Sequence, residues 1–428
     1  MLKSKNVLIA VTGSIAIYKA LELVRLFVKA KANVRVVMSQ DAKRFIMPLC
    51  FEALSGNKVL DEDTESWAND NNHIAIGKWA DILVLAPATA NTINKLNNGL
   101  ADNLLTQIVL AFDGIKILAP AANTKMIENP ITQASLKMLK LCKFEIIEPI
   151  SKDLLCKDFG TGALAKVEDI FYASARALLS QDFWTNRNVV LSGGGSIEKI
   201  DDVRYISNFS SGKMANALAL ALYLKGANIC LVSTKNTDTL PSAIHKIQVQ
   251  SGSEIKQFLN DSLRVAKKGV LSEMNIIDDK AKQLIQKKPF LFMLAAISDY
   301  KPRFAQEGKI KKEVLGDIWK LELKQNEDIL ASLSNSNKDF FSIGFKAELD
   351  AENAKASAKN MLKNKELDGV CLNIISAKNP FGGENNNIEF FSRKTENASD
   401  KTEKKLSGDK FALSMELLDL LEGEFINA

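Results

Sequence analysis

Residues 6–18 read NVLIAVTGSIAIY, and residues 188–198 read NVVLSGGGSIE. Each stretch is a short run of Val, Ile and Leu, as in a buried parallel strand, followed by a turn of Gly and Ser. The backbone N–H groups of such a turn, with the N-terminus of a following helix, favour an anion. One such stretch indicates a phosphate or nucleotide binder, and two predict two nucleotide-type domains in one chain.

Strand-like and helix-like patterns alternate along both halves of the chain. In the first half, we predict helices at 15–30 and 41–54, and strands at 7–11, 34–38, 81–87 and 116–120. In the second half, we predict a helix at 211–225 and strands at 189–196, 228–233, 246–250, 290–298, 340–345 and 368–375. Repeated β–α units predict α/β domains with a doubly wound parallel sheet, whose ligands bind beyond the carboxyl ends of the strands.

The expected domain boundary lies near Asp182, which gives domains of residues 1–182 and 183–428. Two polar, lysine-rich stretches, 267–288 and 392–410, are expected to be solvated surface, and the first looks like an added loop or helix.

The composition limits the class of protein. The 428 residues suffice for two or three domains, and the net charge of +5 comes from interspersed charges without a basic stripe, which argues against a nucleic-acid partner. The five cysteines have neither paired nor zinc-binding spacing, so a reducing cytoplasm is the expected location. We expect no signal peptide and no membrane span, because the apolar runs are too short.

Small polar residues follow the strand predicted at 81–87. Thr89, Asn91 and Thr92 come directly after it, and a polar bend follows at 97–102. Such groups can hold a phosphate and the polar edge of a ring, whereas a helix cap explains any one of them but not the cluster. The TGSIA turn at 12–16, taken by itself, is better explained by turn chemistry alone.

Two other side chains are candidates only in context. His73 is one of two histidines, and the polar β–α loops predicted around it favour a functional role. Cys156 lies beside Lys152 and Lys157 and ahead of a glycine-rich turn, a setting that can tune a thiol for proton donation. The alternative for Cys156, inert packing, stays open.

The most distinctive segment is VRYISNFSSGKMANALA at 203–219. Its serines, Asn208 and Lys213 precede an Ala/Leu-rich helix, and this combination makes a phosphate cradle without the GxxxxGK[ST] pattern of a P-loop. The GKIKKE segment at 308–313 adds Lys309, Lys311 and Lys312. These lysines could neutralise a triphosphate or form an exposed basic loop, and the sequence favours neither.

The ordered motifs resemble those of one enzyme family, the bifunctional bacterial phosphopantothenoylcysteine decarboxylase/phosphopantothenate–cysteine ligase. They are TGSIA, HIxxxKWAD, PATANT, PAxNxxM, CxDxGxG, SGGGxxExIDxVRYISNxSSGKM, AAxSDYxP, KIKK and IGFxAE, and they cover nearly the whole chain. The resemblance implies an N-terminal flavoprotein domain and a C-terminal Rossmann-like ligase domain. It also implies two steps of coenzyme A biosynthesis: CTP-dependent ligation of 4′-phosphopantothenate with L-cysteine through an acyl-cytidylate, then FMN-dependent decarboxylation of 4′-phosphopantothenoylcysteine to 4′-phosphopantetheine.

For the flavin half, the resemblance assigns His73 as the essential histidine, Asn123 as the group that grips the substrate carboxylate, and Cys156 as the acid that protonates the enethiolate. The flavin would oxidise the thiol side to a thioaldehyde, which provides an electron sink for the loss of carbon dioxide, and then return the hydride. The implied FMN-binding positions are Gly13, Ser14, Ile15, Ala16, Ser39, Ala88 and Thr89.

For the ligase half, the resemblance places Asn208 at the acyl-cytidylate, Lys309 on the triphosphate and Asp299 at the cytosine or ribose. Mg²⁺ is the implied metal, and with lysine it would stabilise charge on the departing pyrophosphate. The other implied CTP-binding positions are Met293, Leu294, Ala295, Asn326, Glu327, Asp328, Ile329, Phe345, Lys359 and Lys363.

Related assemblies imply a homo-oligomer, trimer-based or dodecameric in the flavin domain and dimeric in the ligase domain. The chain departs from the family pattern at Ala122, Ile127, Ala215 and Glu327, where Met, Trp, Gly and Pro are usual. The first two departures are expected to loosen packing over the flavin. None removes a residue with a chemical role.

Three other functions fit parts of the pattern. A decarboxylase fused to an inactive nucleotide-binding half is disfavoured because Asn208 and Lys309 are present. A regulatory protein on the same flavin fold, which binds phosphatase partners, is disfavoured because Cys156 is present and the C-terminus is not strongly acidic. An NAD-dependent dehydrogenase is disfavoured because no GxGxxG with a following acidic residue occurs.

Overall fold

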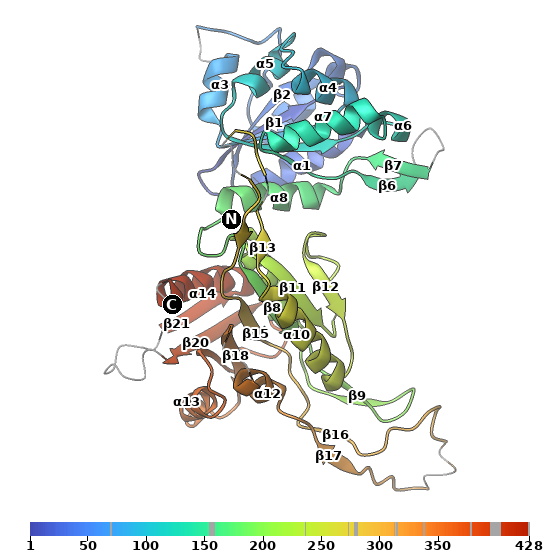
Figure 1. Ribbon diagram of the computed structural model, residues 1–428, viewed down its shortest axis with the longest axis vertical. Coiled ribbons are helices and arrows are strands. Elements are labelled where there is room, and N and C mark those ends of the chain that lie inside the picture. Colours follow the sequence, from blue (N-terminus) through green and yellow to red (C-terminus); the bar gives the residue numbers. More distant parts are fainter. Residues whose placement is uncertain are drawn as a thin grey trace. The chain divides into compact units, whose positions relative to one another are not determined.

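Figure 1 shows a computed structural model of the chain, which divides into two compact units. The first unit consists of Met1–Leu179 with Ser272–Gln283, and the second of Ser180–Leu271 with Leu284–Ala428. The structure describes residues 1–428 except 69–70, 154–158, 236, 273, 278–280, 312, 314–315, 337–338, 377–378, 394–403 and 427–428.

The first unit contains seven strands, eight α-helices and two short 3-10 helices among its described residues. They are β1 (Asn6–Val11), η1 (Ile15–Ile17), α1 (Tyr18–Lys29), β2 (Asn33–Met38), η2 (Gln40–Arg44), α2 (Pro48–Ser55), α3 (His73–Trp79), β3 (Ile82–Ala88), α4 (Ala90–Asn97), α5 (Leu104–Ala111), β4 (Ile115–Pro120), α6 (Thr124–Ile127), α7 (Pro130–Leu141), β5 (Phe144–Ile146), β6 (Ile150–Asp153), β7 (Phe159–Ala163) and α8 (Val167–Leu179).

The core of the first unit is a parallel five-stranded sheet in the order β2-β1-β3-β4-β5. Every residue of β3 is buried, because a central parallel strand is covered on both faces. On one face Leu8, Leu83 and Leu85 pack with apolar residues of α3, α4, α5 and α7. α1 and α8 contact each other, and α8 also contacts β3 and β4 (Figure 1).

Several helices of this unit begin at a short polar side chain. The side chains of Ser39, Asn72, Thr89, Asn103 and Asn123 each accept a backbone N–H of the first helical turn that follows. Such caps satisfy donors that have no partner inside the helix. They explain why helices start directly after the strand ends, where the polar motifs lie.

The helix predicted over 41–54 is wrong in its middle, because the segment forms η2 and α2 as separate pieces. Met47 is extended, with φ −69° and ψ 140°, since the proline ring of Pro48 disfavours helical geometry in the residue before it. Pro48 then starts α2, a position where its missing N–H costs nothing.

The second unit has its own set of elements. They are β8 (Asn188–Gly193), β9 (Ile197–Lys199), β10 (Tyr205–Ser207), α9 (Lys213–Leu224), β11 (Asn228–Ser233), β12 (His245–Gln248), α10 (Gly252–Ala266), β13 (Val270–Leu271), β14 (Leu284–Ile285), β15 (Phe290–Met293), β16 (Tyr300–Pro302), β17 (Leu323–Gln325), α12 (Ile329–Ser336), β18 (Phe341–Glu348), α13 (Ala354–Asn364), β19 (Gly369–Ile374), β20 (Asn385–Ser392), β21 (Lys404–Asp409) and α14 (Lys410–Phe425).

An eight-stranded sheet in the order β12-β11-β8-β15-β18-β19-β20-β21 forms the centre of the second unit. The strands from β12 to β19 are parallel, and β20 and β21 continue the sheet in antiparallel fashion. The two-stranded ladder β16–β17 extends away from this sheet as an arm (Figure 1). Both units are therefore α/β, which confirms the predicted fold class.

Two surface stretches differ from their expected form. Residues 404–409 are mostly exposed, as expected, but they form the edge strand β21, whose charged side chains suit an edge, while 394–403 lie outside the described residues. The 267–288 stretch contains an antiparallel pair, β13 with β14, instead of an added helix. Between these strands, the backbone N–H of Ile276 donates to the carbonyl of Leu141 over 3.1 Å.

In the part of the chain that the structure describes, no helix combines the length and apolar character that a bilayer crossing requires.

Candidate active sites

The first unit contains a cavity of about 660 Å³ beyond the carboxyl ends of β1, β3 and β4. This volume lies in the range of small-molecule and cofactor sites. Ala88 is fully buried at the end of β3 and is not among the lining residues. Among the predicted positions, the cavity is lined by Gly13, Ser14, Ile15, Ala16, Ser39, Thr89 and Asn123.

Side-chain hydrogen bonds hold the turns around this cavity. The Thr12 hydroxyl donates to the carbonyl of Pro87 over 2.7 Å and accepts the N–H of Thr89 over 3.1 Å, so it joins the ends of β1 and β3. The Ser14 hydroxyl accepts the N–H of Ala16 over 3.2 Å. A Cβ on Gly13 would lie 2.6 Å from the Cβ of Asp41, so the TGSIA turn passes too close to its neighbour for a larger residue.

Asn123 lies next to β7, the strand that follows Cys156 in the sequence. Asn123 caps α6 by accepting the N–H of Lys125 over 3.0 Å, and it lines the cavity. Cys156 itself lies outside the described residues, between β6 and β7. β7 is fixed beside Asn123, because the N–H of Ala122 donates to the carbonyl of Gly162 over 3.0 Å and a Cβ on Gly162 would lie 2.2 Å from the Ala122 oxygen.

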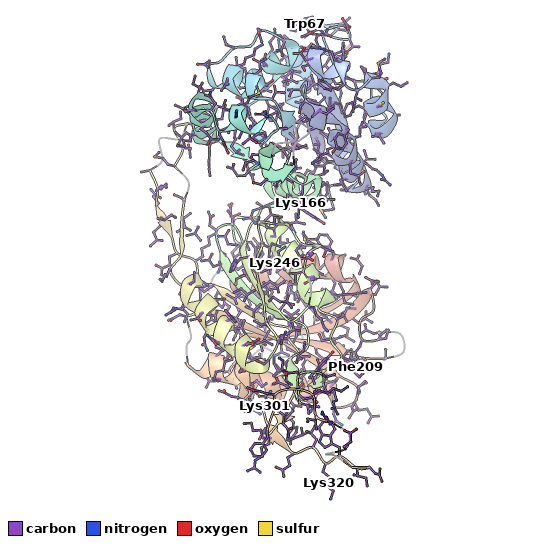
Figure 2. All side chains as sticks on the ribbon, turned by 90° about the vertical axis from the view of Figure 1, so that its right-hand side faces the viewer. Trp67, Lys166, Phe209, Lys246, Lys301 and Lys320 are labelled. Carbon is purple, nitrogen blue, oxygen red and sulfur yellow. The ribbon has the colours of Figure 1, made fainter. Side chains whose placement is uncertain are left out.

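His73 is not among the residues that line this cavity. It starts α3, and its Nδ1 lies 2.8 Å from Oε1 of Glu65. Its ring also lies edge-on to that of Trp67 at a centroid distance of 5.4 Å, and Figure 2 shows Trp67 at the surface of the first unit. Within one chain, the structure does not bring His73 together with Asn123.

In the second unit, the glycine turn after β8 brings Asn208 close to the sheet. Gly194 has φ +82°, and a Cβ there would lie 2.2 Å from Oγ1 of Thr234. A Cβ on Gly195 would lie 2.6 Å from the carbonyl oxygen of Asn208. The Asn208 amide donates to the carbonyl of Ile297 over 3.1 Å. The turn therefore needs glycine because the Asn208 segment packs directly against it.

A second cavity of about 430 Å³ lies at the end of β15, beside Phe345 in the middle of β18. It brings together the predicted positions Met293, Ala295, Asp299, Asn326, Glu327, Asp328, Ile329 and Phe345. Leu294, Asn208 and Lys309 are not among its lining residues.

Buried polar groups support the wall of this second cavity. The Ser192 hydroxyl is fully buried and accepts the N–H groups of Leu294 and Ala295, each over 3.1 Å. The Glu198 carboxylate, 5% exposed, accepts the N–H of Gly252 over 3.0 Å and the side-chain amide of Asn326 over 3.2 Å. Sequence reasoning missed both supporting residues, although each lies in the SGGGxxE motif.

The two lysines of α13 that are expected to bind CTP do not line the second cavity. Lys359 and Lys363 are exposed and do not line the cavity, whereas Met361 lines it, as does Lys365, just after the helix. The Lys365 ammonium lies 2.7 Å from Asp328 Oδ2. Partial burial opposes ionisation of Asp328, but the backbone N–H of Ala331 and the Lys365 ammonium outweigh it and lower the pKa of this carboxyl.

Two other predicted groups lie on the surface. Lys309 is exposed in the loop before β17. Lys213, in the expected phosphate cradle, forms an ion pair with Glu384. Phe209, beside Asn208, is 90% exposed, and Figure 2 shows it at the surface of the second unit.

Among the described residues, no group of three or more His, Cys, Asp or Glu side chains could hold a metal ion.

Comparison with known proteins finds a matching family model for each half of the chain. Residues 1–179 match the family model described as flavoprotein, and residues 184–273 and 270–418 match the DNA/pantothenate metabolism flavoprotein C-terminal domain. The chain is 35% identical to the coenzyme A biosynthesis bifunctional protein CoaBC of Haemophilus influenzae over 91% of this chain and 92% of the relative. The CoaBC protein of Bacillus subtilis is 33% identical over 91% of each chain.

Among solved structures, a mutant PPC decarboxylase complexed with pantothenoylaminoethenethiol is 34% identical. The match covers 40% of this chain and 97% of that one, with a TM-score of 0.37.

Proposed function

The chain belongs to the CoaBC family of coenzyme A biosynthesis bifunctional proteins, and on this premise we propose how its two units divide the chemistry. The protein is a flavoprotein enzyme with decarboxylase and ligase activities in coenzyme A biosynthesis. The first unit would carry the FMN-dependent decarboxylation, with residues 1–182 as its domain. The second unit would carry the ligation of 4′-phosphopantothenate with L-cysteine and CTP, within the domain predicted at residues 183–428. The observation that carries this division is the pair of separate cavities, one beyond each parallel sheet.

The first cavity fits FMN in size and in chemistry. The TGSIA turn and the Ser39 and Thr89 caps supply N–H and hydroxyl groups suited to the FMN phosphate. Bound FMN would supply the electron sink for carbon dioxide loss. Asn123, at the cavity wall, would orient the substrate carboxylate through its side-chain amide. Cys156 would deliver the proton to the enethiolate carbon, and His73 would act as the essential histidine.

The second cavity would hold the cytidine part of CTP. Asp299 would accept from the cytosine amine or a ribose hydroxyl, and the Asn326–Ile329 turn would contact the nucleotide. Asn208 would hold the activated acyl group, which the cysteine amine attacks, and Lys309 would bind the triphosphate. Mg²⁺ would arrive with CTP, because this ion uses few protein ligands when substrate phosphates supply the others.

We further propose a cytoplasmic homo-oligomer, either trimer-based or dodecameric, with dimers of the ligase domain. Large exposed apolar side chains mark surfaces that bind other chains. In the first unit Met47, Leu49 and Ile131 are each exposed by 67–69%.

A product assay tests the whole proposal. The protein is mixed with 4′-phosphopantothenate, cysteine, CTP and Mg²⁺, and products are followed by mass. We expect pyrophosphate release before carbon dioxide release, and 4′-phosphopantetheine as the product. Activity with ATP but not with CTP would contradict the nucleotide assignment, and accumulation of phosphopantothenoylcysteine would contradict the decarboxylase assignment.

Gly13→Val is expected to lower the FMN content of the purified protein at least tenfold. The valine Cβ would lie 2.6 Å from the Cβ of Asp41, so the turn must move away from the position that suits the phosphate. The flavin absorbance per chain measures this loss. Gly77→Val is the matched control, because a Cβ at Gly77 meets nothing within 4 Å. Equal flavin content in both variants would show that the TGSIA turn does not hold FMN.

Lys365→Met is expected to raise the KM for CTP about tenfold, and Lys363→Met to change it less than twofold. Both are lysines at the same end of α13, but only Lys365 lines the second cavity. A hydrogen bond from an ammonium group to the cytosine carbonyl or a ribose hydroxyl is worth about 1.5 kcal/mol, or roughly tenfold. Steady-state pyrophosphate release as a function of CTP concentration measures both constants. The reverse ranking would support Lys363, the position that the family resemblance implies.

A further inference from the structure

The loop that carries Lys309 is fastened to a second segment of the same unit, residues 200–204. Immediately before Lys309, the N–H of Gly308 donates to Oδ2 of Asp202 over 2.7 Å. The carbonyl of Gly308 in turn accepts the N–H of Asp202 over 3.2 Å. Two residues further back, the N–H of Gln306 donates to the carbonyl of Ile200 over 3.0 Å.

Immediately after Lys309, the backbone of Ile310 is held in the same way. Its N–H donates to Oδ2 of Asp201 over 3.2 Å, and its carbonyl accepts from Nη2 of Arg204 over 2.7 Å. Both backbone polar groups of each neighbour of Lys309 therefore have a partner in residues 201–204.

The 200–204 segment is held in place by contacts of its own. The Asp201 side chain has no exposed area, and its Oδ1 accepts the N–H groups of Val203 and Arg204 over 2.8 and 2.7 Å. Burial opposes ionisation of Asp201, but these N–H groups, that of Ile310 and the charge of Arg204 outweigh it and lower the pKa of the carboxyl. The Arg204 guanidinium also lies over the Trp319 ring, 4.8 Å from its centroid.

We propose that Asp202 and Asp201 are positioning residues for the ligase step, which fix the backbone on both sides of Lys309 and so direct its ammonium group to the nucleotide triphosphate. This inference rests on the proposed role of Lys309. Asp202 occupies the unspecified position of the IDxVRYISN motif, so the motif itself assigns it no role. Neither carboxylate is among the residues that line the second cavity, and both would act through the loop backbone.

The arrangement has a physical consequence for catalysis. A lysine in an exposed loop samples many positions, and the charge it offers a departing pyrophosphate is useful only in one of them. Because Gly308 and Ile310 are held by residues 201–204, the backbone around Lys309 has fewer conformations to lose when the nucleotide binds. Loss of the anchor should therefore lower the turnover rate more than the affinity for CTP.

Asp202→Ala in the full chain tests the proposal through two independent measurements. We expect kcat for CTP-dependent pyrophosphate release to fall five- to tenfold, the effect of one lost hydrogen bond to an ionised group, with less than a threefold change in KM. We also expect trypsin to cleave the Lys309–Ile310 bond several times faster than in the unaltered protein, as measured by peptide mass. Asp202→Asn keeps an oxygen acceptor for Gly308 and should restore at least half of the rate and of the protection.

Glu307→Ala is the matched control, because Glu307 is an exposed carboxylate of the same loop and is outside the 201–204 contacts. It should match the unaltered protein in both measurements. Unchanged turnover and unchanged cleavage in Asp202→Ala would overturn the inference while Lys309→Ala remains impaired. Unchanged pyrophosphate release in Lys309→Ala would instead overturn the proposed function of Lys309 itself.

Discussion

Lys309→Ala is expected to lower CTP-dependent pyrophosphate release by two to three orders of magnitude, while the protein keeps its FMN. The departing pyrophosphate carries negative charge that grows in the transition state, and removal of one group aimed at such charge costs a hundred- to thousandfold in rate. The turns that we propose to bind FMN lie in the other unit, so flavin content should not change. Pyrophosphate release and flavin absorbance, measured on the same preparation, check both parts.

Lys311→Ala is the control for this result, because Lys311 is an exposed cation two residues further along the same loop. The backbone anchors act on Gly308 and Ile310, so Lys309 lies between two residues that the described contacts hold in place. We expect less than a fivefold effect for Lys311→Ala. Equal losses in the two variants would mean that the loop acts through its total charge, and that Lys309 has no specific position on the triphosphate.

The parallel core of each unit could be predicted from the sequence, and the edges could not. Stretches such as LVLAP in β3 are continuous apolar runs, because both faces of a central strand are covered. The edge strand β21 reads KKLSGD, and its exposed, charged residues resemble a loop because one face and one edge meet water. Composition therefore separates buried strands from surface, but does not separate an edge strand from a loop.

Most of the second cavity could be predicted for a topological reason. Its walls come from two neighbouring parallel strands and the segment after β15, so Met293, Ala295 and Phe345, which the family resemblance implies, meet although Phe345 is far from the others in sequence. The lysines near α13 are different. The family resemblance implies Lys359 and Lys363, which are exposed on the helix, whereas Lys365, just after its end, lines the cavity. Successive residues point about 100° apart around a helix, so which lysine faces a cavity depends on the tertiary structure.

The contacts that fix the site could not be predicted from local patterns. Glu198 reaches Gly252 and Asn326, which are distant from it in sequence, and Asp202 reaches Gly308. Each is an ordinary acidic residue in its own segment, and only the fold decides which backbone N–H it accepts. Motif analysis identifies groups suited to touch a ligand, whereas the groups that hold those side chains in place depend on tertiary structure.

Cys156→Ser is expected to stop the decarboxylase half after carbon dioxide loss. A serine hydroxyl is a far weaker acid than a thiol, and loss of a general acid costs a hundred- to ten-thousandfold in the step that needs it. The variant should bind FMN, release carbon dioxide once and form 4′-phosphopantetheine at least a hundredfold more slowly. Carbon dioxide and phosphopantetheine, quantified in the same reaction, separate the two steps.

The second cysteine variant, Cys50→Ser, separates a specific role of Cys156 from a general sensitivity to thiol loss. Cys50 is a free, exposed cysteine on α2 and is not among the residues that line the FMN cavity, so its replacement should leave both products unchanged. The ligase half supplies an internal reference, because pyrophosphate release should match the unaltered protein in both variants. If Cys156→Ser gave a normal yield of phosphopantetheine, the proton would have to come from another group, and the cavity wall around Asn123 would be the first place to search for it.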